Sequence, residues 1–126
     1  CLFVFAMLYP FMKNPEDLKK IFGADLFDDL SLSKTLNALL GYKAEKPFEC
    51  VGTKREVAIA LYQACRQNQK KLPKLLAYFY NEILPHLKIK DCDYRHALNS
   101  WNKNHCLPPK FEKILKKYFQ NEIKIP

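Results

Sequence analysis

Apolar residues recur at helical spacing along most of this sequence. The pattern is clearest near the C-terminus, where positions i, i+3, i+4, i+7 and i+8 are all apolar: Phe111, Ile114, Leu115, Tyr118 and Phe119. Such a stripe predicts an amphipathic helix with one face in a core. Pro108 and Pro109 stand just before it, and proline suits the first turn of a helix.

Start and stop signals predict five further helices. Thr53 and Glu56 are spaced as a capping box, and Gly23 and Gly41 follow two apolar stripes as glycine does at helix ends. The expected helices cover residues 15–23, Ser31 or Ser33 to 40, 53–69, 73–84, and Asp91 or Asp93 to 104. Residues 42–52 read as a loop and 123–125 as frayed or strand-like. The pattern predicts an all-α fold, a compact bundle of about six short helices.

The first twelve residues, 1–12, carry no charge. They predict a buried helix interrupted at Pro10, because apolar runs of this length are more often core helices than signal segments. If the segment is exposed instead, it predicts a site for a protein partner. The chain opens with Cys1 rather than Met, so we expect it to be a fragment of a longer polypeptide.

Charge divides the 126 residues unevenly. Residues 1–45 hold five lysines and six acidic residues, a net charge of −1. Residues 46–126 have a net charge of +9, so the whole chain carries +8. We therefore expect a near-neutral N-terminal helical segment and a basic helical region, within one compact domain. The basic excess favours DNA or an acidic surface as a partner.

Three basic clusters in the second region suit nucleic acid. Arg and Asn pair bidentately with base edges, which makes one cluster a candidate for reading bases: Arg95, Asn99, Asn102 and Lys103. Two lysine clusters suit phosphates: Lys70, Lys71 and Lys74, and Lys110, Lys113 and Lys117. The alternative is that each cluster is an ordinary solvated helix face. Seven residues join helices 73–84 and 92–104, so only a variant helix-turn-helix is expected.

The remaining chemistry is sparse. The five cysteines include no C-x-x-C pair, which favours free thiols in a reducing compartment, the cytoplasm. Four residue types that bind zinc lie close in sequence, but their spacing matches no standard pattern: Cys92, His96, His105 and Cys106. We therefore predict no metal, and without a catalytic or cofactor motif we predict no cofactor and no enzyme activity. Without an apolar run of about 18 residues, we predict no membrane segment.

Three stretches carry a resemblance to a known family. They are V-G-T-K with E-V-A-I-A-L-Y-Q-A over 51–64, L-L-A-Y-F-Y-N-E-I-L leading into I-K-D-C-D-Y-R over 75–95, and K-F-E-K-I-L-K-K-Y-F over 110–119. Together they resemble the C-terminal region of RteC-type regulatory proteins of Bacteroides conjugative transposons. The segment 99–109 departs from that family because it has one Lys and no Arg. The resemblance implies a DNA-binding regulator of a mobile element without enzyme activity.

Three functions therefore stand as hypotheses. The first is a DNA-binding domain of a bacterial mobile-element or transcription regulator. The alternative is a non-catalytic helical domain of a larger protein, acting in interaction or structure. The third is a fragment of an enzyme whose active site lies mostly upstream.

Overall fold

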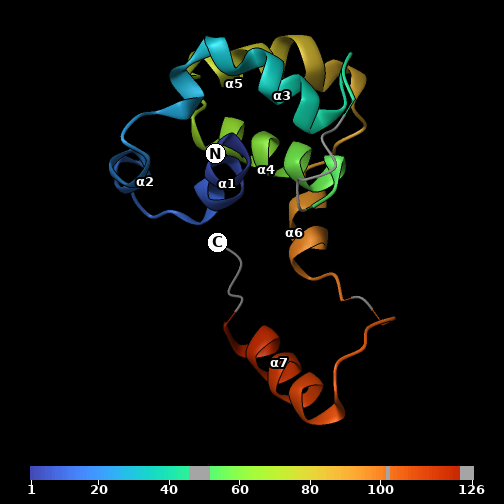
Figure 1. Cartoon of the computed structure of the whole chain (residues 1–126). Coiled ribbons are helices and arrows are strands. Elements are labelled where there is room, and N and C mark those ends of the chain that lie inside the picture. The colour runs from blue at the N-terminus through green and yellow to red at the C-terminus, as the bar shows by residue number, and fades with distance from the viewer. Residues whose placement is uncertain (46–51, 102, 123–126) are drawn as a thin grey trace. The chain divides into compact units, whose positions relative to one another are not determined.

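The computed structural model describes residues 1–45, 52–101 and 103–122, with side chains as far as residue 119, and every regular element in these ranges is helical (Figure 1). The α-helices are α1 (Leu2–Leu8), α2 (Pro15–Phe22), α3 (Ser33–Leu40), α4 (Lys54–Gln67), α5 (Lys74–Tyr78), α6 (Asp93–Leu98) and α7 (Pro109–Glu122). Short 3-10 turns cover Tyr9–Phe11, Leu26–Asp28, Leu30–Leu32 and Leu84–His86. The predicted all-α fold is confirmed, whereas the predictions for residues 46–51 and 123–125 lie outside the described ranges.

The chain forms two compact units, Cys1–Asp91 and Cys92–Pro126. This division falls at a different place from the change in charge at residue 45, which lies inside the first unit. No helix in the described ranges is long and apolar enough to span a bilayer.

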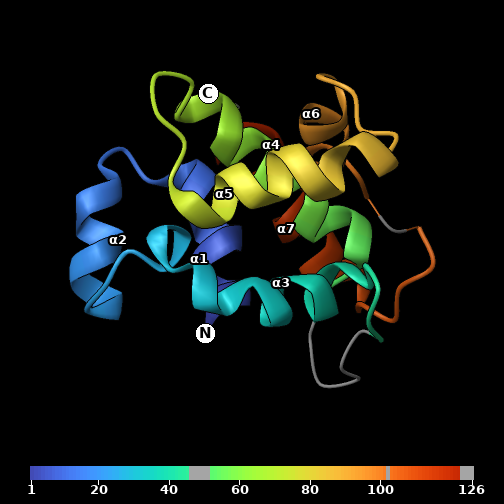
Figure 2. The ribbon, with the colours of Figure 1, turned by 90° about the horizontal axis from the view of Figure 1, so that it is seen from above.

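Helix α4 runs through the first unit, with α1, α3 and α5 packed against it (Figures 1 and 2). Its residues from Val57 to Leu61 are all buried, so it presents apolar groups on more than one face. It is therefore the central helix of the first unit. Helix α2 lies at the edge of the unit in both views.

Helix α1 and the turn after it confirm the predicted buried segment that breaks at Pro10. Phe5 is fully buried, and its ring meets those of Phe27 and Phe22 edge-on, with centroids 4.9 Å and 5.2 Å away. Val4 and Leu8 lie on the opposite face and are 42% and 44% exposed. A protein partner on that outer face stays a prediction.

Most predicted helix ends are confirmed. Gly23 and Gly41 end α2 and α3 in the left-handed conformation, with φ of 74° and 61°. Thr53 and Glu56 form the expected capping box at the start of α4. The predicted serine cap of α3 is wrong, because the Asp29 side chain accepts from the Ser31 amide and starts a 3-10 turn that runs into α3.

The predicted helix over residues 73–84 forms, but not as one regular α-helix. It passes from α5 into a π-helical turn over Phe79–Ile83 and then into the 3-10 turn. Pro85 explains the change, because proline donates no amide hydrogen bond and its ring crowds the carbonyl four residues earlier. The wider turn still buries Phe79 and Ile83, so the predicted core positions are kept.

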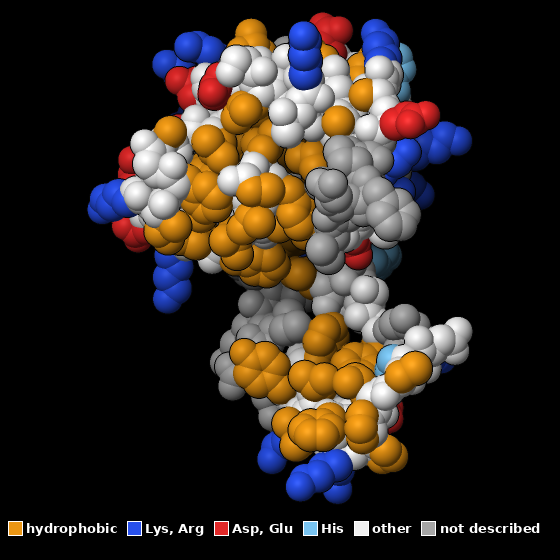
Figure 3. All heavy atoms as spheres, viewed as in Figure 1, with side chains coloured by type: hydrophobic (Ala, Val, Ile, Leu, Met, Phe, Trp, Pro, Cys, Tyr) orange, Lys and Arg blue, Asp and Glu red, His pale blue; other side chains and the backbone are white. Residues whose placement is uncertain are grey.

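The second unit differs more from the prediction. Helix α6 ends at Leu98, six residues before the expected end. Helix α7 forms, but its apolar stripe is not buried: Phe111, Ile114 and Tyr118 are 57%, 55% and 62% exposed. Figure 3 shows these hydrophobic side chains along one face of α7 with lysines at its margin. Within this unit the Trp101 ring meets the rings of His105 and Phe119 edge-on, with centroids 5.5 Å and 6.0 Å away.

Candidate functional site

A hollow of about 470 Å³ opens beside the C-terminal half of α4. Residues from α4, from the turn after it, from the π turn and from the end of the first unit line it: Tyr62, Cys65, Arg66, Gln69, Leu72, Tyr80 and Asp91. Its volume falls in the range of small-molecule sites, about 300 to 1,000 Å³. It is thus large enough for part of a substrate.

Asp91 organises the polar side of this hollow. Its carboxylate accepts a hydrogen bond of 2.7 Å from the Tyr62 hydroxyl and lies 3.5 Å from the Arg66 guanidinium. The hydrogen bond to Asp91 raises the pKa of Tyr62. The Arg66 and Asp91 side chains are 44% and 72% exposed, and ion pairs this exposed contribute about 0 to 1 kcal/mol. Arg66 can therefore change partners at little cost.

Cys65 lies at the buried side of the hollow. Its thiol donates weakly to the Leu76 carbonyl, 3.8 Å away. Burial raises the pKa of this thiol to about 12. Since the thiolate is the reactive form, Cys65 is unsuited to act as a nucleophile or base at neutral pH.

A second hollow, of about 430 Å³, adjoins the first and shares Arg66 and Gln69 with it. Six consecutive residues line it as α4 ends and turns: Arg66, Gln67, Asn68, Gln69, Lys70 and Lys71. Asn68 fixes this turn, because its side-chain amide donates to the Ala64 carbonyl and to the Tyr9 hydroxyl at 2.8 Å and 3.0 Å. The lysines thus extend from a well-anchored turn.

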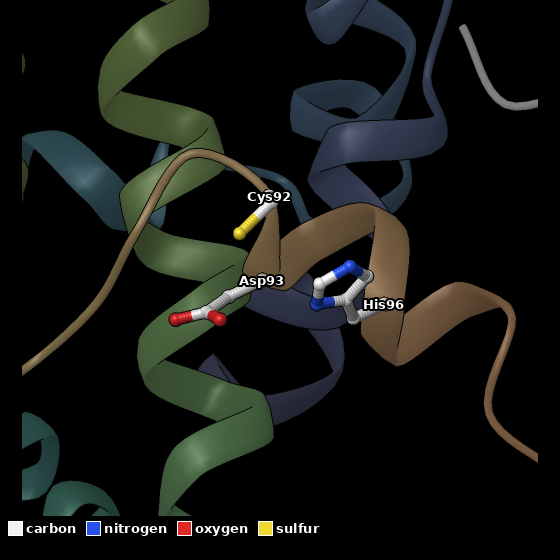
Figure 4. A group of neighbouring side chains, drawn as sticks. All are labelled: Cys92, Asp93 and His96. Carbon is white, nitrogen blue, oxygen red and sulfur yellow. The ribbon is translucent and has the colours of Figure 1, made fainter.

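The structure gathers a different metal-binding set from the one suggested by the sequence. Cys92, Asp93 and His96 place one ligand atom each within 4.8 Å of one another, and Figure 4 shows them on one side of the start of α6. His105 instead pairs with Glu112 at 3.6 Å, and Cys106 is exposed. Three protein ligands are one fewer than a structural zinc site uses. Asp93 is the member of this group that the sequence did not suggest, and its place beside Cys92 was the available signal.

The structure does not place the predicted base-reading residues on one helix face. Arg95 lies in α6, but Asn99 follows the helix and Lys103 lies beyond it, because α6 ends at Leu98. The Asn99 side chain donates 2.9 Å to the Arg95 carbonyl. Asn102 lies outside the described residues. The helix that was expected to carry these side chains therefore ends before Asn99 and Lys103, and their role in reading bases stays a prediction.

The predicted phosphate-binding lysines are exposed and stand on separate elements. Lys110, Lys113 and Lys117 lie on α7, and Lys70 and Lys71 lie in the turn after α4. Lys74 begins α5, but its amide donates to the Asp28 carboxylate at 3.3 Å. The amide at this helix start therefore already has a carboxylate partner.

The Asp caps predicted before α6 are also wrong. Asp91 is held by Tyr62 and Arg66, and the N-cap residue of α6 is Cys92, whose side chain makes no capping hydrogen bond. The signal for Asp91's actual role was not local, because its partner Tyr62 lies 29 positions earlier.

Relatives of the chain decide its family. Residues 1–93 match the MurL C-terminal domain, which is most of the chain. The chain belongs to this family. It is 35% identical over 109 residues to the UDP-N-acetyl-alpha-D-muramoyl-L-alanyl-L-glutamate epimerase of Xanthomonas oryzae pv. oryzae, a match that covers 86% of the chain and 24% of that protein.

Two further relatives carry the same epimerase name. The Micromonospora protein is 42% identical over 69 residues, which are 55% of the chain and 15% of the relative. The Salinispora tropica protein is 44% identical over 61 residues, which are 48% of the chain and 13% of that relative. The chain thus spans about a quarter or less of the length of these proteins. No solved structure matches it significantly.

Membership of the MurL C-terminal domain family corrects three expectations. The resemblance to RteC-type regulators is wrong, and so is the function that it implied, a DNA-binding regulator of transcription or a mobile element. The prediction of no enzyme activity is contradicted as well, because these relatives are named as epimerases, of which the chain matches about a quarter or less. The alternative of a non-catalytic helical domain in a larger protein fits the family better. The nucleic-acid roles of the individual basic residues stay untested predictions.

Proposed function

We propose that this chain is the helical C-terminal domain of an epimerase that acts on UDP-N-acetylmuramoyl-L-alanyl-L-glutamate. The family match over residues 1–93 carries the proposal, together with 35% identity over most of the chain to an epimerase of that name. In this proposal the domain binds substrate or supports the rest of the enzyme.

The chemistry of the hollow supports a binding role. Direct inversion of an amino-acid centre removes the Cα proton and returns a proton to the opposite face, which needs groups that exchange protons near neutral pH. The Cys65 thiol, with its pKa raised to about 12, stays protonated there. The Tyr62 hydroxyl, whose pKa the hydrogen bond to Asp91 raises, also keeps its proton. Arg66 and the two tyrosines of the hollow are suited to hold a ligand.

We also place the enzyme in the cytoplasm. Cys1, Cys65, Cys92 and Cys106 are free thiols in the described part of the chain, which is the usual state of cysteines in a reducing compartment.

A domain exchange tests the proposal. The 109-residue match in the Xanthomonas oryzae epimerase is replaced by the corresponding part of this chain, and the same enzyme without that segment is the control. Each protein is incubated with the UDP-linked dipeptide, and the stereochemistry of both amino acids is read by chiral chromatography after hydrolysis.

We expect the exchanged enzyme to invert the substrate and the truncated one to be inactive. An exchanged enzyme that is folded and soluble but shows no inversion contradicts the proposal. A truncated enzyme with full activity contradicts the need for the domain.

A further inference from the structure

The two adjoining hollows at the end of α4 combine two kinds of surface. One side is basic, with Arg66, Lys70 and Lys71 within six consecutive residues. The other side carries the rings of Tyr62 and Tyr80 together with Leu72. Arg66 and Gln69 line both hollows, so the basic and aromatic surfaces meet at these residues.

The charge of the basic side favours an anionic ligand. The C-terminal end of a helix carries about half a negative charge, and three cations exceed it. Asp91 is the acidic residue that lines the first hollow, and its exposed pair with Arg66 at 3.5 Å contributes little free energy. A phosphate that offers Arg66 a bidentate pair would therefore displace Asp91 readily.

The aromatic side favours a flat ring. Tyr80 is 47% exposed although it lines the hollow, so its ring is accessible to a ligand. Nucleobases stack on tyrosine rings of this kind, whatever the base. The Tyr62 hydroxyl is held by Asp91 at 2.7 Å, which fixes one wall in place.

We propose that these hollows bind the nucleoside diphosphate part of a UDP-linked substrate. The diphosphate lies against Arg66, Lys70 and Lys71, and the uracil ring lies against Tyr62 and Tyr80. This inference rests on the proposed function, since the relatives' name supplies the uridine diphosphate group. It assigns the domain the task of holding the substrate by the end that does not react.

Binding of UDP to the 126-residue chain tests the inference. Titrations by calorimetry at low salt compare UDP with inorganic pyrophosphate and with uridine. We expect UDP to bind about tenfold or more tightly than pyrophosphate, because stacking adds to the phosphate contacts. Uridine alone should bind weakly.

Substitutions separate the two surfaces. Removing charge from the basic side should lower the affinities for UDP and pyrophosphate alike, by about tenfold. This result is expected for Arg66→Gln and for the double change Lys70→Gln with Lys71→Gln. Tyr80→Ala should lower the affinity for UDP to that for pyrophosphate and leave the affinity for pyrophosphate unchanged. The matched control is Lys34→Gln on α3, an exposed lysine that lines neither hollow, and it should bind UDP as the unchanged chain does.

Three outcomes overturn the inference. They are the absence of saturable UDP binding up to millimolar concentration, equal affinity for UDP and pyrophosphate, and an Arg66→Gln variant that binds UDP unchanged. The domain exchange distinguishes this failure from that of the proposed function. If the exchanged enzyme is active but the 126-residue chain does not bind UDP, the inference alone is refuted. If the chain binds UDP but the exchanged enzyme is inactive, the proposed function is refuted.

Discussion

Replacing Phe5 by alanine tests the described core most directly. Phe5 is fully buried, and its ring lies 4.9 Å, 5.2 Å and 6.0 Å from those of Phe27, Phe22 and Tyr9. Truncating a buried phenylalanine costs about 3 to 5 kcal/mol. Each of the three aromatic neighbours contributes about 0.5 to 1.5 kcal/mol beyond the effect of buried area, so the loss should lie at the upper end of this range. We therefore expect a loss of about 4 to 5 kcal/mol in the free energy of unfolding.

Such a loss is a large fraction of the stability of a small domain, about 5 to 15 kcal/mol. A milder change, Phe5→Leu, keeps most of the volume and should cost about 1 to 2 kcal/mol. Urea unfolding followed by circular dichroism measures both. The reaction of the buried Cys65 thiol with a thiol reagent reports separately on the first unit, because Cys65 is 3% exposed when folded.

Phe111→Ala on α7 is the matched control. That phenylalanine is 57% exposed, so its loss should change the free energy of unfolding by no more than about 0.5 kcal/mol. A loss below about 1.5 kcal/mol for Phe5→Ala, or a larger loss for Phe111→Ala, would refute the described arrangement of the core.

Three further changes have defined outcomes. Thr53→Ala removes the side chain that caps α4 and should cost about 1 kcal/mol in urea unfolding; no change would mean that the capping box with Glu56 contributes nothing. Asn68→Ala leaves the buried Tyr9 hydroxyl and a helix carbonyl without their amide partner, and should cost about 1 to 3 kcal/mol in the same assay. Cys65→Ala removes a thiol whose pKa burial raises from near 9 to about 12. Because the folded state holds this proton more tightly, stability falls by up to about 1.4 kcal/mol per pH unit between those values, and the variant should lose less over that range; equal slopes would contradict the burial of the thiol.

Local signals predicted much of the fold. The ends of α2 at Gly23 and of α4 at Thr53 were predictable because each depends on residues a few positions apart. The burial of α1 was predictable because the first twelve residues form an uncharged apolar run. The early end of α6 was not predictable in this way, because the apolar residues up to Trp101 continue the helical period while the chain leaves the helix at Leu98.

The candidate site depends on contacts that no local pattern records. The Asp91 carboxylate looked like a helix cap from its place before α6, but it accepts from Tyr62, which is 29 residues away. Lys70 and Lys71 were noted as phosphate ligands from their charge. The tyrosines of the adjoining hollow became apparent only in the structure, where the π turn places Tyr80 on it. The charge of a segment follows from its residues, whereas the shape of a hollow depends on residues that are far apart in the sequence.

The position of α1 in the core has a consequence for the protein during its synthesis. Tyr9 pairs with Asn68, 59 positions later, so the first helix cannot reach its place until α4 has been made. At about 5 to 20 residues per second, the ribosome needs about 3 to 12 seconds for that stretch. Throughout this interval the uncharged segment 1–12 lacks its partner α4, and it is the part of the nascent chain that we expect chaperones to hold.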